Sequence, residues 1–412
     1  MLLLLLLTGC LRCPRRRRAG WCYDEPTCFH RSATRLGSSA LFAPAAGCAC
    51  AVHEDCNCAY LPYCDGASFS GFRAAPWPDE VAHPAPRMAS RLTTPSNTLT
   101  AQRLTFRGLA NLDAALDALV AQHGLGSTPA TGGGAAGGAE LEVVLTGDSA
   151  GGLATILHAD RVRARVQRAM AAQPPPPPPP PPPPSPQSSS PPSPPTTTLK
   201  FRAVPVVGAF LDHGNVRGDS QNYTAWTRSL VAAQNVTGSG ALSPACLAAH
   251  GGQGGGLDDG GQSFRCFMAP HALPFVATPL FLVNSKFDSW QLNNELQARC
   301  LLANDYPCEG AERAGVLQYG ADWLAAFPRQ ALLAGGHGAF VTSCVCHGCP
   351  WATLTAGAGA NLTAWQAVAA WYSGETVGDA NLHIDARGPN GDGSIPASRS
   401  CLLVQTCCID VL

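Results

Sequence analysis

The 412-residue chain is poor in charge, in lysine and in long apolar runs, and each shortage excludes a class of protein. Charged residues make up 13% of the chain, half the ~25% that is usual in soluble domains, and the formal net charge is −1. This composition offers no basic surface to nucleic-acid phosphates, so we expect no nucleic-acid partner. The longest apolar run, residues 2–7, is far shorter than the ~20 residues of a membrane span, so we expect no span.

Glycine and proline, in contrast, are abundant, and proline is concentrated in one segment. Residues 174–184 are consecutive prolines followed by Ser/Pro and Thr repeats, a composition that favours polyproline II and forms no packed core. We interpret residues 172–198 as an insert in one α/β domain formed by residues 20–171 and 199–412. Residues 1–19 are an atypical N-terminus. A secretory signal peptide carries its positive charges before its apolar run, whereas Arg15–Arg18 follow the leucine run of this chain. The leucine run is therefore either an unusual targeting segment or a buried strand.

Nineteen cysteines indicate an oxidising compartment and a disulfide framework. Three glycosylation sequons, at Asn222, Asn235 and Asn361, agree with secretion. Some cysteine clusters could instead ligate zinc, but their spacing differs from the paired CxxC of structural zinc sites, so we expect no metal. The residues concerned are Cys48, Cys50, Cys56, Cys58, Cys344, Cys346, His347 and Cys349.

Hydrophobic periodicity predicts alternating helices and strands. Apolar residues recur at helical spacing over residues 108–123 and again over residues 151–168. Residues 141–146 and 279–283 are short, apolar runs of the kind found in buried parallel strands. The alternation predicts the α/β class, with a parallel sheet covered by helices.

A pentapeptide of the form GxSxG, residues 147–151, stands between the first of these strands and the following helix. In a nucleophile elbow, a serine on a sharp strand-to-helix turn is held exposed, and flanking glycines avoid steric clashes. Ser149 is therefore a candidate nucleophile. The start of the helix also places the backbone N–H of Ala150 where it could bind an oxyanion. An ordinary glycine-rich turn is the alternative.

A nucleophilic serine needs a base and an orienting carboxylate. Asp288 follows the strand at residues 279–283 and is a candidate for the carboxylate, although it could equally cap a helix beginning near Gln291. Three histidines follow Asp288, namely His337, His347 and His383. His337 and His347 both lie in glycine-containing loops, and the pattern alone does not choose between them.

Several blocks in order resemble the pectin acetylesterase family, which includes the Notum-type carboxylesterases of animals. The resemblance covers about residues 20–371, interrupted by the proline-rich insert. The matching blocks are residues 21–39, 63–71 (YCDGASFSG), 147–154 and 288–290, and Ser343-Cys344 with His347. The YCDGASFSG block is the most specific, because no general argument about hydrolases predicts it.

The resemblance implies an α/β-hydrolase fold, with a mostly parallel sheet flanked by helices and disulfide-rich loops. It implies a catalytic triad of Ser149, Asp288 and His347, and an oxyanion hole formed by backbone N–H groups of Gly20, Trp21 and Ala150. It further implies a secreted enzyme of the extracellular space or cell wall that needs no cofactor and releases acetate from an acetylated polysaccharide such as pectin. We expect a monomer.

The chain departs from the family pattern in the loop around Gly20 and next to Ser149 and His347. Arg18-Ala19-Gly20-Trp21-Cys22 replaces a loop that reads Gly-Gly-Gly-Trp-Cys in the family, and Asp148 stands where plant members usually have cysteine. Gly348 is an additional residue before Cys349. Two alternatives to the acetylesterase therefore stay open. One is lipid deacylation of a protein, as in Notum-type relatives, and the other is a non-catalytic wall glycoprotein whose proline-rich insert is the working part.

Overall fold

The computed structural model describes residues 2–8, 56–63, 65–76, 104–127, 140–172, 198–220, 222–251, 262–301, 308–349, 351, 354–356 and 362–389. Within these ranges the strands form one parallel sheet of seven strands in the order β2-β1-β3-β4-β5-β6-β7. Their bounds are β1 Leu2–Thr8, β2 Cys56–Pro62, β3 Glu140–Asp148, β4 Thr198–Val206, β5 Phe281–Ser285, β6 Gly338–Thr342 and β7 Leu382–Ile384.

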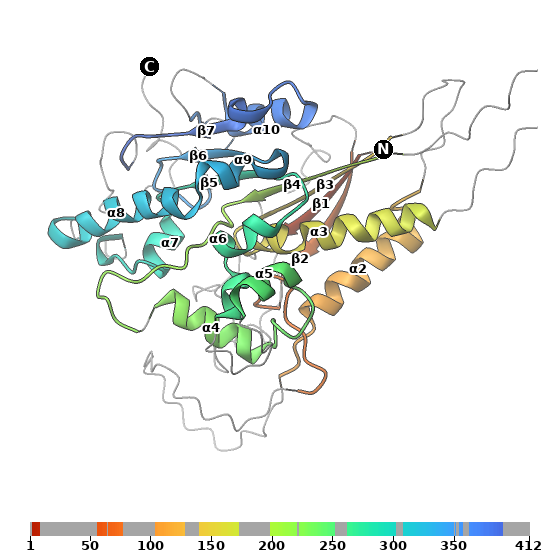
Figure 1. Cartoon of the computed structure of the whole chain (residues 1–412), viewed down its shortest axis with the longest axis horizontal. Coiled ribbons are helices and arrows are strands. Elements are labelled where there is room, and N and C mark those ends of the chain that lie inside the picture. The colour runs from red at the N-terminus through yellow and green to blue at the C-terminus, as the bar shows by residue number, and fades with distance from the viewer. Residues whose placement is uncertain are drawn as a thin grey trace, which may run out of the picture.

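Helices connect and cover these strands (Figure 1). They are α2 Gly108–His123, α3 Ala150–Ala171, α4 Tyr223–Ala233, α5 Pro244–His250, α6 Ala269–Ala272, α7 Ser289–Asn294, α8 Gly310–Ala326, α9 Arg329–Leu333 and α10 Ala364–Ser373. Short 3₁₀ turns occur at Ser263–Phe267, Leu273–Phe275, Arg299–Leu301, Ala334–Gly336 and Gly378–Asn381. None of the described helices is both long enough and apolar enough to cross a membrane.

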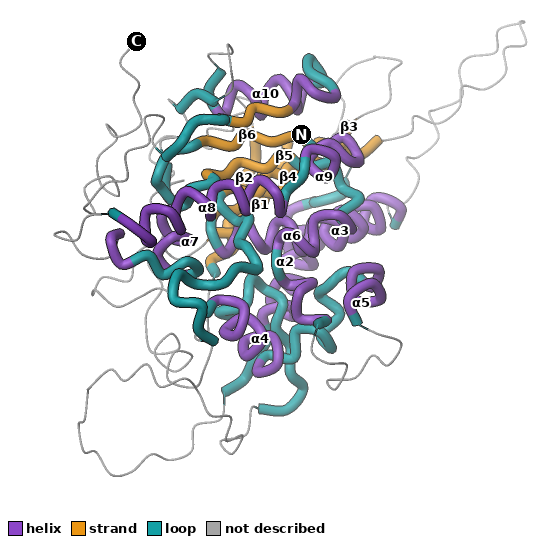
Figure 2. Tube along the Cα trace, turned by 60° about the vertical axis from the view of Figure 1, so that its left-hand side comes forward, coloured by secondary structure: helices purple, strands orange, loops and turns teal. Residues whose placement is uncertain are grey.

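The sheet is packed on both faces, as a parallel sheet requires. Leu141, Val143 and Leu145 of β3 pack in the larger core cluster, which includes residues of α3 and α8. Val144, on the opposite face of β3, packs in a second cluster with Phe340 and residues of α10. Figure 2 shows α10 on one side of the strands and α3, α4 and α5 on the other. The expected fold class is thereby confirmed.

The sequence patterns located most of these elements well. The predicted helix at residues 108–123 is α2, and the strand and helix around Ser149 lie within β3 and α3. The strand expected at residues 279–283 is displaced to β5, Phe281–Ser285. Pro279 has no N–H to donate, and Leu280 forms only an isolated bridge with Ala203, so regular pairing begins one residue later.

Segments on both sides of the proline-rich insert contribute strands to the same sheet, since β3 pairs with β4 along its whole length. The leucine run forms β1 between β2 and β3, which corresponds to the strand alternative. The sequons at Asn222 and Asn235 lie on partly buried side chains, whose amides donate hydrogen bonds to the carbonyl oxygens of Asp219 and Phe72.

Candidate active site

Ser149 lies on a sharp turn between the end of β3 and the start of α3. Its backbone has φ 56° and ψ −121°, a conformation that non-glycine residues rarely adopt and that costs about 1–3 kcal/mol. The Ser149 N–H donates to the carbonyl oxygen of Val206 at 2.9 Å, which holds the turn against β4. Ser149 is the N-cap of α3, but its hydroxyl does not cap the helix. The hydroxyl is therefore available to another partner.

The turn also depends on a close approach between two backbones. A β-carbon added to Gly152 would lie 2.3 Å from the carbonyl oxygen of Val206, and one added to Gly208 would lie 2.2 Å from the carbonyl carbon of Gly152. Gly152 stands one residue beyond the GxSxG pentapeptide, so the pattern does not include it. Only glycine at both positions lets the first turn of α3 rest on the segment after β4.

Gly152→Ala is therefore expected to lower the free energy of unfolding by about 3 kcal/mol, because backbone atoms would have to move to admit the methyl group. Urea unfolding measures this change. Gly348→Ala is the matched control, because Gly348 is exposed and an added β-carbon would meet no atom of the described residues within 4 Å. A Gly152→Ala protein as stable as the Gly348→Ala protein would contradict the packing described.

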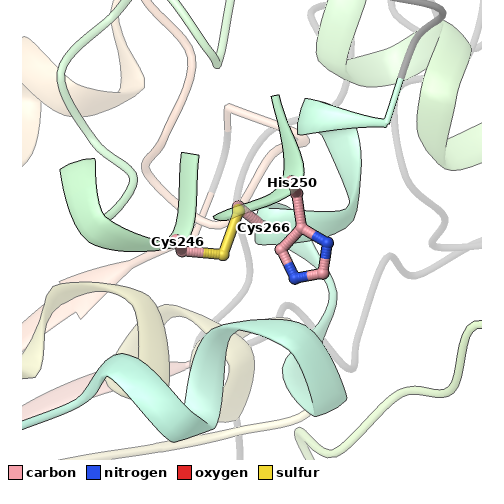
Figure 3. Close-up of side chains that lie close together, drawn as sticks. All are labelled: Cys246, His250 and Cys266. Carbon is pink, nitrogen blue, oxygen red and sulfur yellow. A yellow bond between two sulfur atoms is a disulfide. The ribbon is translucent and has the colours of Figure 1, made fainter. Parts of the chain in front are cut away.

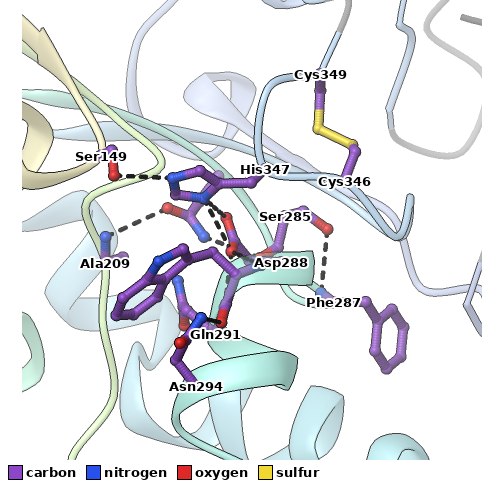
Figure 4. A network of polar contacts seen from close by, with 12 residues as sticks. Ser149, Ala209, Ser285, Phe287, Asp288, Gln291, Asn294, Cys346, His347 and Cys349 are labelled. Carbon is purple, nitrogen blue, oxygen red and sulfur yellow. Dashed lines mark hydrogen bonds and ion pairs between the residues drawn. A yellow bond between two sulfur atoms is a disulfide. The ribbon is translucent and has the colours of Figure 1, made fainter. Parts of the chain in front are cut away.

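His347 lies in the loop after β6 and contacts the serine directly (Figure 4). Its Nε2 atom is 2.8 Å from the Ser149 hydroxyl oxygen, and its Nδ1 atom is 2.8 Å and 3.0 Å from the two carboxylate oxygens of Asp288. The His347 side chain is 10% exposed. Burial by itself would lower the pKa of His347, but the charge and hydrogen bond of Asp288 outweigh burial, so the pKa is raised.

Asp288 makes the contacts expected for both interpretations of its sequence context. It is fully buried, and its Oδ1 atom accepts hydrogen bonds from the backbone N–H groups of Trp290 and Gln291, which makes it the N-cap of α7. The same carboxylate contacts His347. The helix cap thus fixes the orientation of the carboxylate that orients the imidazole.

Together these contacts form a Ser–His–Asp chain of hydrogen bonds. An N–H on Nδ1 that donates to Asp288 leaves Nε2 unprotonated, and Nε2 can then accept the proton of Ser149. Ala150 is the first residue of α3, so its N–H is one of the free donors at the helix start. The other two expected oxyanion donors, Gly20 and Trp21, lie outside the described residues.

The other two candidate histidines have different surroundings. His337 is buried, and its Nδ1 atom accepts from the backbone N–H of Leu280 at 3.2 Å. Burial lowers the pKa of His337 to about 4, so it is neutral at physiological pH. His383 lies between Phe281 and Phe340, and burial lowers its pKa as well. Of the three, only His347 contacts Ser149.

Aromatic rings cover one side of the Asp288–His347 pair. The ring centroid of Trp290 is 6.2 Å from that of His347, and Trp290 also meets Phe210 and Tyr223 edge to face at 5.1 Å and 5.9 Å. These rings keep water from the pair on this side, and a lower local dielectric strengthens its electrostatic interaction.

The YCDGASFSG block braces the start of α3. Ser68 and Phe69 both have positive φ, and the fully buried Ser68 hydroxyl donates to the carbonyl oxygen of Ala150 at 2.7 Å. His158 of α3 contacts the Ser68 carbonyl oxygen and the Ser70 hydroxyl through Nε2. Burial lowers the pKa of His158 to about 4, so this contact is made by a neutral ring. The block thus supports the helix turn that follows the serine.

A second set of contacts joins the loops that carry Asp288 and His347. The Ser285 hydroxyl donates to the carbonyl oxygen of Cys344, and the ammonium group of Lys286, which is 4% exposed, donates to the carbonyl oxygen of Asp385 at 2.6 Å. The Asp385 carboxylate accepts from the Ser343 hydroxyl at 2.7 Å. Sequence reasoning did not identify Ser285, Lys286 or Asp385 as part of this arrangement. The signal available was Lys286 itself, one of only two lysines in the chain.

Of the cysteine clusters considered for zinc, the one around His347 is occupied by disulfides. Cys346 and Cys349 are joined on either side of His347, and Cys344 is also disulfide-bonded. Sulfur and nitrogen atoms of Cys246, His250 and Cys266 also lie within 4.8 Å of one another, but the two cysteines form a disulfide (Figure 3). A disulfide has no thiolate to offer a metal. Cys300–Cys308 is a further bridge.

Comparison with known structures shows the same fold in an animal enzyme. Two crystal forms of the Wnt deacylase Notum from Drosophila superpose with a TM-score of 0.58, covering 94% of this chain and 88% of the other. Sequence identity is 19% and 18%, so this similarity concerns the fold alone.

Comparison of sequences identifies relatives in a plant. Pectin acetylesterase 5 of Arabidopsis thaliana is 25% identical over 86% of this chain and 70% of its own length. Pectin acetylesterases 11 and 7 are each 26% identical over 67% of this chain, which spans 53% of their length. The family model of the pectinacetylesterases matches residues 18–173 and 193–393. The unmatched stretch between these ranges falls within the proline-rich insert. The chain belongs to the pectinacetylesterase family of carboxylic ester hydrolases.

Proposed function

We propose that the protein is a secreted serine esterase that removes acetyl groups from a cell-wall polysaccharide such as pectin. The observation that carries this proposal is the unbroken chain of contacts from Asp288 through His347 to the strained Ser149. The plant relatives support the acetylated polysaccharide as substrate. The disulfides support an oxidising, extracellular location.

The proposed reaction proceeds through an acyl-enzyme. His347 Nε2 accepts the proton of Ser149 as the serine oxygen attacks the ester carbonyl, and Asp288 stabilises the imidazolium that forms. The N–H of Ala150, with those of Gly20 and Trp21, stabilises the tetrahedral oxyanion. The imidazolium returns its proton to the sugar oxygen as that oxygen leaves. Water then hydrolyses the acetyl-serine, with His347 again as the base, and acetate is released.

Substrate preference and covalent labelling test the proposal together. We expect the purified protein to release acetate from acetylated pectin and to have a higher kcat/KM for p-nitrophenyl acetate than for p-nitrophenyl palmitate. A fluorophosphonate should react once with each protein molecule, and mass spectrometry should find the added phosphonyl group on the peptide that contains Ser149. Preference for the palmitate ester would favour lipid deacylation instead. Absence of both turnover and labelling would favour the non-catalytic glycoprotein.

A further inference from the structure

Asp148, the residue before the serine, carries a buried carboxylate that the triad does not account for. The residue is 4% exposed, and its Oδ1 atom has no hydrogen-bond partner among the described residues. The neighbouring strands place Thr8 and Val206 opposite it, and neither ionises. Burying a carboxylate with an unpaired oxygen is costly, so its retention calls for a compensating interaction.

The position of Asp148 on β3 directs it toward the loop of His347. Side chains alternate along a strand, so Asp148 shares a face of β3 with Val144. Val144 packs in the core cluster that also contains Cys344, Cys346 and Cys349. These cysteines flank His347 in the sequence. Asp148 thus lies on the face of the sheet against which these cysteines pack, and it is adjacent in sequence to Ser149, which His347 contacts.

The charges of Asp148 and His347 act on each other. Burial raises the pKa of Asp148 to about 6, and His347 partly opposes this rise. In return Asp148 adds to the effect of Asp288 in raising the pKa of His347. Within the part of the chain that the structure describes, the ionisable residues that act on His347 by charge are Asp288, from the start of α7, and Asp148, from the end of β3.

We propose that Asp148 is a positioning residue that acts through His347, its ionised carboxylate stabilising the imidazolium that forms when Ser149 attacks the ester. This proposal rests on the proposed function, because it assigns Asp148 a part in that reaction. It gives the imidazolium two carboxylates in place of the single one of the triad. It also makes the rate depend on the ionisation of Asp148.

The expected pH dependence follows from the sign of the interaction. Catalysis needs neutral His347, so kcat/KM falls as the pH drops through the raised pKa of His347. Asp148→Asn removes one negative charge, which lowers the pKa of His347 and moves this acidic limb by roughly one pH unit to lower pH. The same change removes stabilisation of the imidazolium, so the plateau rate at higher pH falls by roughly tenfold.

The pH profiles of the wild-type and Asp148→Asn proteins on p-nitrophenyl acetate test the proposal. Glu142→Gln is the matched control, because Glu142 is a carboxylate on the same face of β3, six residues or about 20 Å away, near Lys200 and Tyr372. The control should leave both the limb and the plateau in place. An Asp148→Asn plateau that falls without a shift of the limb would indicate a merely structural role and would overturn the proposal.

NMR titration of the His347 ring separates this proposal from the proposed function. The wild-type ring signal, assigned by its loss in His347→Asn, should show a second inflection near pH 6 as Asp148 ionises. A single inflection would overturn the proposal, whether or not esters are hydrolysed and whether or not Asp148→Asn folds. A protein with two inflections but no turnover would refute the esterase and retain the coupling between the two groups.

Discussion

Ser149→Ala is expected to lower kcat for p-nitrophenyl acetate by about 10⁵–10⁶-fold, because the substitution removes the atom that forms the acyl-enzyme. The remaining activity should be that of the oxyanion donors and of substrate binding. The backbone strain at position 149 should be the same in the variant, because alanine also has a β-carbon and would also adopt φ 56°. The folded state should therefore be little changed, and the loss should lie in kcat.

Ser289→Ala is the matched control for this variant. Ser289 is 3% exposed and directly follows Asp288, and no described residue forms a hydrogen bond with its hydroxyl. Its removal changes a buried serine beside the site without touching the chain of contacts to Ser149. Steady-state kinetics on both variants, with circular dichroism to verify folding, would decide the matter. Retention of wild-type kcat by Ser149→Ala would refute the proposed nucleophile.

Asp288→Asn is expected to lower kcat by about 10⁴-fold. The Asn side chain can still cap α7 through its carbonyl oxygen, so the fold should persist. Its amide N–H₂ group favours the tautomer in which Nδ1 of His347 accepts. Nε2 then carries the proton and can no longer take one from Ser149. The effect should appear in kcat at pH values where His347 is neutral.

Asp322→Asn provides a comparison that also breaks an Asp–His contact. Asp322 lies 3.1 Å from Nε2 of His213, and its side chain is 39% exposed. An exposed pair of this kind contributes little, so kcat should change by less than about twofold. Stopped-flow measurement of acylation for both variants would separate the chemical step from product release. Equal rates for Asp288→Asn and the wild type would exclude Asp288 from the mechanism.

The residues around Ser149 were predictable because their signals are local. A strand, a glycine-rich turn and a helix occupy one continuous stretch, and the structure has them within β3 and α3. The two interpretations of Asp288 could not be separated by sequence, because the same carboxylate caps α7 and contacts His347. The residue pattern left His337 and His347 open, since the choice depends on the sheet order, which brings the loop after β6 to Ser149, 198 residues away in the sequence.

Contacts between segments that are far apart in the chain could not be predicted from the sequence. Lys286 meets the backbone of Asp385 across 99 residues, and Ser68 meets Ala150 across 82. Neither contact leaves a periodic signal. Strand β7 has only three residues, too few for an alternating pattern to identify it. The bounds of β5 depended on a single missing donor at Pro279.

The attachment points of the proline-rich insert show where the fold accommodates a long addition. The insert follows α3, which ends at Ala171, and precedes β4, which begins at Thr198. In a parallel sheet the first residues of strands lie at one edge and the last residues at the other. Ser149 and Asp288 both follow the last residues of their strands. Additions between α3 and β4 therefore start from the edge remote from Ser149 and Asp288, so they need not disturb the contacts between these residues and His347.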